Sequence, residues 1–149
     1  MISFLSIAAV VSIGLMIGVE FAVWVFINPI LWKLDDQPRA QAVQLFARKL
    51  GTAMPFWYAL NLLFLIAESV VLRHEWEASL LVAAAAIWTA VIILTLIFLV
   101  PINNRLAGEQ AHESPAQAQR EHKRWDSMHR ARVVALGAAM VLFLAAVHY

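Results

Sequence analysis

The chain has 149 residues, of which 62% are hydrophobic and only 14% are charged, with a net charge of +1. Soluble domains average about 45–50% apolar and about 25% charged residues. A soluble protein of this length could not bury so much apolar side chain, so lipid must cover the excess. The chain has no cysteine, which excludes disulfides, thiolate metal sites and cysteine nucleophiles.

Four apolar segments are predicted to cross a membrane as helices, because about 20 mostly apolar residues span a hydrocarbon core. The predicted spans are about 4–32, 52–72, 77–100 and 131–148, all within one domain, 1–149. The first is far longer than the apolar region of a signal peptide, about 7–15 residues, so we interpret it as a retained helix. The predicted fold class is all-α, an integral membrane four-helix bundle with amphipathic cytoplasmic connections.

Several residues predict where the helices begin and end. Residues 38–50 have the apolar spacing of a short helix on the membrane surface. Thr52 is predicted to cap the second span, with Pro55 in its first turn, and Pro101 is predicted to follow the end of the third. Residues 114–117 are typical of a capping box with proline at the first helical position, so one helix is predicted to run from there to the end of the chain.

Basic residues are concentrated around the first and third connections. The ten residues there are Lys33, Arg39, Arg48, Lys49, Arg105, Arg120, Lys123, Arg124, Arg130 and Arg132. The opposite side of the membrane holds Arg73 alone. Because cytoplasmic loops carry the excess of basic residues, both long connections are predicted in the cytoplasm and both termini outside, in a bacterial cytoplasmic membrane. The same rule explains the basic run 120–132, so nucleic acid is not an expected partner.

Ionisable and polar residues inside the spans are costly and are candidates for function. Glu20 lies in the first span, and Trp24 and Asn28 follow on the same helical face at i+4 and i+8. Asn61 and Glu68 share one face of the second span. Glu20 and Asn61 lie about 18 Å and about 14 Å from the cytoplasmic ends of their spans, so they can line one cavity. The alternatives are a protonated Glu20 that only fixes helix packing, and a Glu68 that reaches water.

A second polar cluster is predicted at the cytoplasmic end of the spans. The chain directly after the third span carries amide and guanidinium groups, on Asn103, Asn104 and Arg105. The last helix carries one stripe at i, i+4 and i+7, consisting of Trp125, His129 and Arg132. These groups suit an anionic or phenolic ligand, with Arg132 or Arg105 as the charge partner and His129 as acid or base. The alternative is anchoring at the membrane interface, where Trp and Arg are common.

A metal site is not predicted. Of the five histidines only His122 and His129 share a helical face at suitable spacing, and the chain has no HExxH or paired Glu-x-x-His pattern. The sequence leaves a haem or a metal open, but no cofactor is expected.

The two cytoplasmic motifs resemble a family. Residues 101–106 (PINNRL), followed by Arg124-Trp125 and then by His129 and Arg132, resemble the small four-helix membrane proteins that include the anthrone oxygenases and are otherwise largely known as a domain of unknown function. The resemblance covers essentially the whole chain. It implies a four-helix membrane fold and, in characterised relatives, oxygenation of an anthrone to an anthraquinone. The functional positions that it implies are Asn103, Asn104, Arg105, Trp125, His129 and Arg132.

Two functions follow as hypotheses. The first is an oxidoreductase, a monooxygenase that uses dioxygen as co-substrate and oxygenates a planar, lipophilic phenolic or polyketide substrate that partitions into the bilayer. His129 would take the substrate proton, Arg132 or Arg105 would stabilise the oxyanion, and Asn103 or Asn28 would orient the ring carbonyl. The second is a non-catalytic membrane protein that binds a lipid or quinone or scaffolds a partner, with small residues offering a surface for a homo-oligomer. A transporter is less favoured, because no inverted repeat is evident.

Overall fold

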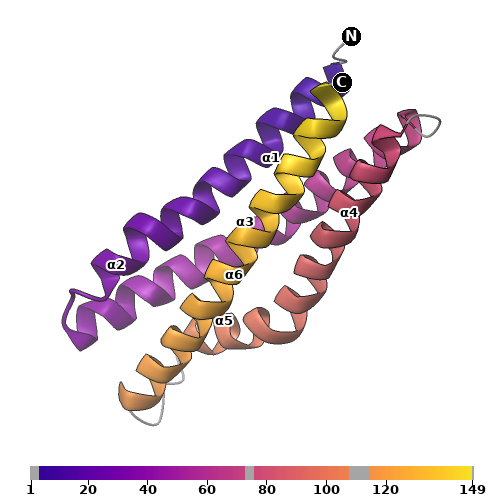
Figure 1. The fold of residues 1–149 in the computed structure, drawn as a ribbon. Coiled ribbons are helices and arrows are strands. Elements are labelled where there is room, and N and C mark those ends of the chain that lie inside the picture. Colours follow the sequence, from indigo (N-terminus) through magenta and orange to yellow (C-terminus); the bar gives the residue numbers. More distant parts are fainter. Residues whose placement is uncertain (1–3, 73–75, 108–114, 149) are drawn as a thin grey trace.

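The structure, a computed structural model, describes residues 4–72, 76–107 and 115–148. Within these ranges every element is helical, as the sequence predicts (Figure 1). The elements are α1 (Phe4–Ala22), η1 (Val23–Ile27), α2 (Asn28–Leu31), α3 (Asp36–Val71), α4 (Glu77–Leu94), η2 (Thr95–Leu99), α5 (Val100–Ala107) and α6 (Pro115–His148). The elements η1 and η2 are single π-helical turns.

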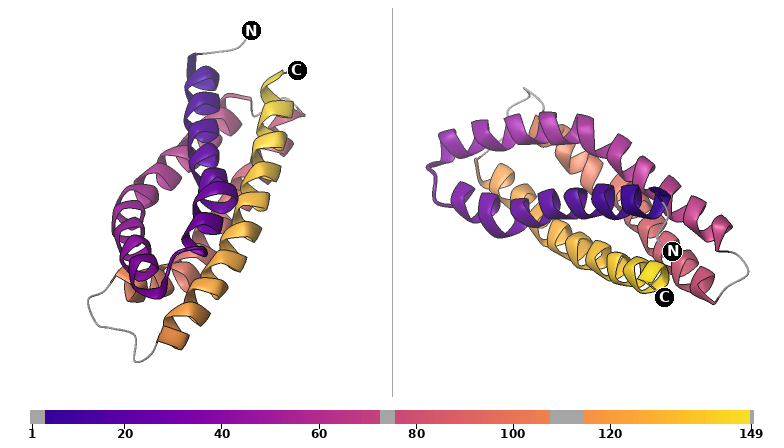
Figure 2. Two further views of the ribbon diagram at one scale, coloured as in Figure 1. Left: turned by 90° about the vertical axis from the view of Figure 1, so that its left-hand side faces the viewer. Right: turned by 90° about the horizontal axis from the view of Figure 1, so that it is seen from above.

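These elements form four long rods, because α1, η1 and α2 are continuous, and so are α4, η2 and α5. Each rod is long and apolar enough to cross a membrane. Many large apolar side chains point outward, as at Phe56 and Leu63, which water would disfavour and lipid accommodates. The chain is therefore a multi-pass integral membrane protein. Figures 1 and 2 place the two chain ends together at one end of the bundle, while α2 and α5 lie toward the other.

Two predicted helix boundaries are wrong. The surface helix predicted over 38–50 and the second span form one 36-residue helix, α3, with Pro55 in its interior. Thr52 does not cap this helix, because its hydroxyl donates to the Arg48 carbonyl at 2.9 Å within the same helix. Pro101 does not follow the end of the third span either, since it is the second residue of α5. The fourth helix does run unbroken from Pro115, whereas the predicted cap Ser114 lies outside the described residues.

A π turn precedes a proline in both interrupted rods. Pro29 is the second residue of α2, directly after η1, and Pro101 has the same position after η2. A proline ring inside an α-helix clashes with the carbonyl four residues earlier. A π turn adds a residue to the turn and changes this hydrogen-bond ladder. The local widening explains why these helices continue through prolines that usually end them.

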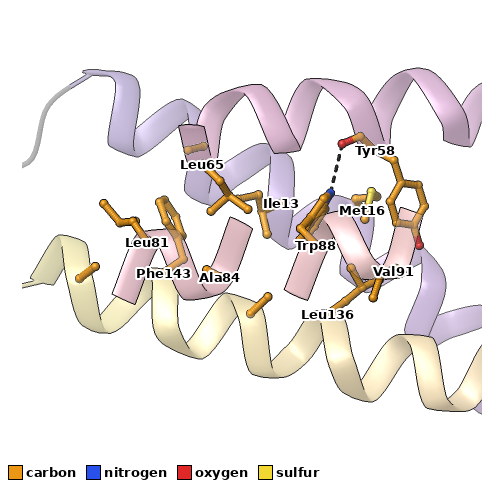
Figure 3. Packing of buried hydrophobic residues seen from close by; sticks show 13 residues of the cluster. Ile13, Met16, Tyr58, Leu65, Leu81, Ala84, Trp88, Val91, Leu136 and Phe143 are labelled. Atoms are coloured by element: carbon orange, nitrogen blue, oxygen red, sulfur yellow. Dashed lines mark hydrogen bonds between the residues drawn. The ribbon is translucent and has the colours of Figure 1, made fainter. Parts of the chain in front are cut away.

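The apolar core fills the half of the bundle nearer the termini. Its fully buried members include Trp88 on α4 and Phe143 and Leu136 on α6, which pack with Ile13 on α1 and Leu65 on α3 (Figure 3). The Trp88 indole N–H donates to the Tyr58 carbonyl at 3.1 Å, which joins α4 to α3. A smaller cluster of Ala47, Ile102 and Leu106 joins α3 to α5 at the far end. The space between the two clusters is where the polar side chains meet.

Candidate functional site

A cavity of about 570 Å³ lies in the half of the bundle away from the termini. Its walls come from η1 and α2, the first part of α3, the segment from Ile92 to Leu106, and the first part of α6. Most lining side chains are apolar, with a small number of polar groups between them. This volume and composition are typical of small-molecule sites, which occupy about 300–1,000 Å³.

Four side chains from three helices form a buried polar network on one wall of the cavity, which we call the Glu20 network. It consists of Glu20 on α1, Tyr58 on α3, and His129 and Arg132 on α6. The Tyr58 hydroxyl donates to Glu20 Oε1 at 2.9 Å, and Arg132 Nη2 donates to Glu20 Oε2 at 2.7 Å. The carboxylate therefore has a partner on each oxygen, although its residue is only 2% exposed.

The contacts of His129 fix the position of its proton. Nε2 lies 3.0 Å from the backbone carbonyl oxygen of Glu20, which can only accept, so Nε2 carries the hydrogen. Nδ1 lies 2.9 Å from Arg132 Nη2, which can only donate, so Nδ1 presents its lone pair. Nδ1 is also 3.2 Å from Glu20 Oε2, a contact that would favour a protonated ring. Because the contact with the guanidinium is the shorter of the two, we assign a neutral imidazole. Both of its nitrogens then have a hydrogen-bond partner.

Arg132 sits where several groups converge. Its guanidinium also lies over the Tyr58 ring, with 5.7 Å from Cζ to the ring centroid. Its Nε is buried and has no hydrogen-bond partner. A buried ion pair is stable only when additional hydrogen bonds satisfy both charges. The guanidinium is therefore held by Nη2 and by the Tyr58 ring, while its Nε stays buried and unpaired.

Stacked rings line the wall beside the network. The Trp125 and His129 rings are parallel within 9°, with centroids 4.7 Å apart. Farther from the core, His122 stacks on Trp32 at 4.4 Å and 14°. His122, Trp125 and His129 all line the cavity. A wall of flat indole and imidazole rings suits a planar aromatic ligand, because such rings prefer offset stacking.

The two π turns face the cavity from opposite rods. η1 contributes Val23 and Ile27 to the lining, and η2 contributes Thr95 and Leu99. The Thr95 hydroxyl is buried and has no hydrogen-bond partner. The other two threonines, Thr52 and Thr89, donate to the carbonyl four residues earlier. π turns occur frequently at functional sites, and here the turn begins at the threonine that lacks the usual bond.

Seven of the ten predicted site residues line the cavity. They are Glu20, Asn28, Asn103, Asn104, Trp125, His129 and Arg132. The Asn28 amide donates to Asp126 Oδ1 at 2.7 Å, which ties α2 to α6. The Asn103 amide donates to the Ala47 carbonyl at 3.4 Å, and a Cβ on Gly51 would lie only 3.0 Å from its nitrogen. The amides of these two residues therefore also hold the helices that form the walls.

Three predicted site residues lie outside the cavity. Trp24, which helical spacing put on the face of Glu20 and Asn28, does not line the cavity. Trp24 packs edge-on against Phe21 instead. Asn61 is fully buried in the core, where it accepts from the Ser12 hydroxyl at 2.6 Å. Arg105 does not line the cavity either, since it is exposed and pairs with Glu121 at 2.7 Å.

The second buried carboxyl of the bundle is Glu68, and it does not reach water as the sequence suggested. Its residue is 2% exposed, and its Oε1 has no hydrogen-bond partner. It lies outside the cavity, toward the end of α3. The alternative interpretation of Glu20 was a protonated side chain that only fixes helix packing. In the structure, Glu20 also forms an ion pair with Arg132.

The described residues contain no group of three or more His, Asp or Glu side chains that could hold a metal ion. His122 and His129 both line the cavity, and each is stacked on an indole ring. His74 and His112 lie outside the described residues.

Sequence reasoning missed Tyr58, which lines the cavity, and Asp126, which lies outside it and accepts from Asn28. Tyr58 lies three residues before Asn61 and therefore on the same helical face, and its hydroxyl needs a partner when it is buried. Asp126 follows Trp125 in a helix that is basic at this point, and it pairs with Arg130 at 3.2 Å as well as with Asn28. A tyrosine inside an apolar span and an acid within a basic run were the available signals.

Fold and site together define a multi-pass membrane protein with an apolar, partly aromatic cavity and a buried ionic group at its wall. The family model described as anthrone oxygenase matches residues 43–142, which is more than half of the chain. The chain belongs to the anthrone oxygenase family, as the two motifs indicated. No curated protein and no solved structure matches it. The matched segment includes Tyr58, His129 and Arg132, whereas Glu20 and Asn28 precede it.

Proposed function

We propose that the protein is a membrane-embedded oxygenase that converts an anthrone-like, planar phenolic substrate to the corresponding quinone. The observation that carries the proposal is the ionic Glu20–Arg132 pair at the wall of a largely apolar cavity within the membrane-spanning helices. Family membership supports the reaction type. A lipophilic substrate would reach this cavity from the bilayer, and stacking on Trp125 would orient its rings.

The proposed reaction needs dioxygen as co-substrate and no cofactor. An anthrone is acidic at the carbon between its rings, and the carbanion formed there can react directly with dioxygen. Both C–H bonds of this carbon are broken, one oxygen atom becomes the new carbonyl group, and the other leaves as water. The protein would assist by removing the first proton and by holding a positive charge beside the enolate oxygen. Arg132, whose side chain lines the cavity beside Glu20, is suited to the second task.

Oxygen uptake tests the proposal directly. Purified protein in lipid vesicles would be supplied with an anthrone, with empty vesicles measuring the uncatalysed oxidation. We expect faster oxygen consumption with one dioxygen used per quinone formed. Arg132→Lys retains the charge but loses the planar fork of donors, so turnover should fall at least about tenfold, whereas Arg105→Lys, outside the cavity, should match the unaltered protein. No acceleration over empty vesicles would refute the proposal.

A non-catalytic role is the second candidate, and one observation favours it. Both oxygens of the Glu20 carboxylate have a donor within the protein, at 2.9 Å and 2.7 Å, as expected of a site that holds its shape for binding. In that case a quinone or lipid would occupy the cavity unchanged. Mass spectrometry of molecules that copurify with the protein, together with the anthrone assay, separates the two functions.

The orientation in the membrane is a proposal as well. The basic residues predict that the end of the bundle holding the cavity faces the cytoplasm and that both termini face outward. Fusing a reporter that is active only in the cytoplasm to the C-terminus tests this, and activity of that reporter would refute it.

A further inference from the structure

We propose that Glu20, and not His129, is the catalytic base of the site and that Arg132 exchanges its partner from the Glu20 carboxylate to the substrate enolate during the reaction. The inference rests on the proposed function and assigns the step that begins it. Glu20 precedes the segment that the family model matches, so the assignment depends on the geometry of this chain.

The geometry first removes His129 from the role of base. Its Nε2 already carries a proton and donates it to the Glu20 carbonyl at 3.0 Å. Its Nδ1 lone pair accepts from Arg132 at 2.9 Å. A base needs a free lone pair within reach of the proton that it accepts, and neither nitrogen offers one. His129 is therefore a positioning residue that orients Arg132 and the backbone at Glu20.

Glu20 is the carboxylate that the described residues place at the cavity wall. The other acid nearby, Asp126, does not line the cavity and is engaged by Asn28 and Arg130. Each oxygen of Glu20 has one donor in the structure, the Tyr58 hydroxyl or Arg132. A carboxylate oxygen has more than one lone pair, so Glu20 can accept a proton while these contacts hold it in place.

The exchange of partners conserves charge, which matters at an apolar site. Before the step, the pair consists of the Glu20 carboxylate and the Arg132 guanidinium. The substrate C–H bond breaks, its proton joins a Glu20 oxygen, and its electron pair becomes the enolate that Arg132 then holds. One anion replaces another beside the same cation, so no isolated charge forms where it would be costly. The Tyr58 hydroxyl remains a donor to the neutral carboxylic acid.

Hydrogen–deuterium exchange into the substrate isolates this step. The protein in vesicles, without oxygen, would be mixed with an anthrone in D₂O, and deuterium at the carbon between the rings would be followed by mass spectrometry. Glu20→Gln should slow the protein-dependent exchange about 10²-fold or more, in the range of general-base effects. Binding of an anthraquinone, measured by quenching of tryptophan fluorescence, should remain. Glu68→Gln changes an equally buried carboxyl outside the cavity. It should catalyse deuterium exchange into the substrate at the rate of the unaltered protein.

Further variants keep the test decisive. Should Glu20→Gln fail to fold, Glu20→Asp retains the charge but withdraws the carboxylate, and it should slow exchange without loss of anthraquinone binding. Exchange that survives in Glu20→Gln, or that is unchanged in Glu20→Asp, would overturn the assignment. If the unaltered protein catalyses neither deuterium exchange into the anthrone nor its oxygenation, the proposed function itself is refuted. Normal oxygenation by Glu20→Gln refutes only the role of Glu20.

Discussion

Removing Arg132 should destabilise the protein far more than removing Arg132 and the charge of Glu20 together. In Arg132→Met the Glu20 carboxylate keeps the Tyr58 hydroxyl but loses the cation at 2.7 Å, and it stays in a site where its residue is 2% exposed. Breaking a buried ion pair from one side costs about 3–5 kcal/mol, because an uncompensated charge remains. In Glu20→Gln combined with Arg132→Met no charge is left, and an apolar replacement of such a pair is often neutral.

Unfolding in mixed detergent micelles with increasing denaturing detergent measures this difference. We expect the single variant to lose about 3–5 kcal/mol of unfolding free energy and the double variant to recover more than half of that loss. Arg105→Met is the matched control, because its pair with Glu121 is exposed and such pairs contribute about 0–1 kcal/mol. A double variant less stable than the single one would refute the reasoning, since it would mean that size and packing dominate over charge.

Three further predictions concern individual side chains. Thr95→Val should raise the unfolding free energy by about 1 kcal/mol or more, because it removes a buried hydroxyl without a partner. Thr89→Val, at an exposed and bonded hydroxyl, should change it little, and a destabilised Thr95→Val would contradict this account. Trp125→Leu should weaken binding of an anthraquinone by roughly 2- to 12-fold, the equivalent of about 0.5–1.5 kcal/mol of aromatic stacking. Trp24→Leu should bind like the unaltered protein in the same fluorescence titration. Asn61→Ala should lower the unfolding free energy by about 1–3 kcal/mol, because it leaves Ser12 and its neighbours unsatisfied. The KM for an anthrone should stay the same. A raised KM with normal stability would place Asn61 in the site.

The sequence predicts the architecture well because the bilayer constrains it strongly. Four apolar stretches of sufficient length allow little besides four helices. The helix ends were less predictable. Pro55 and Pro101 are breakers when judged locally, yet both lie inside long rods. Packing against neighbouring helices and the π turn before Pro101 compensate for the missing backbone hydrogen bond, and neither is visible in local sequence.

Several residues that are costly in their surroundings do line the cavity, whereas Asn61 and Glu68 do not. Glu20 was identified because a carboxyl inside an apolar span demands a reason, and the stripe of His129 and Arg132 followed from helical spacing. Trp24 does not line the cavity and packs against Phe21, because spacing along one helix does not say which part of a face the neighbouring helices enclose. Tyr58 was overlooked because an aromatic residue in a span is ordinarily a packing residue. Its role depends on which helix faces it, which spacing along one helix cannot supply.

The asymmetric filling of the bundle has a consequence for the ion pair. Trp88, Phe143 and their neighbours close one half of the bundle, while the cavity with its ionic pair occupies the other half. In the proposed reaction, the charge would shift between Glu20, Arg132 and a ligand, all within the cavity half. The packed apolar cluster separates the ion pair from the end of the bundle that holds the termini.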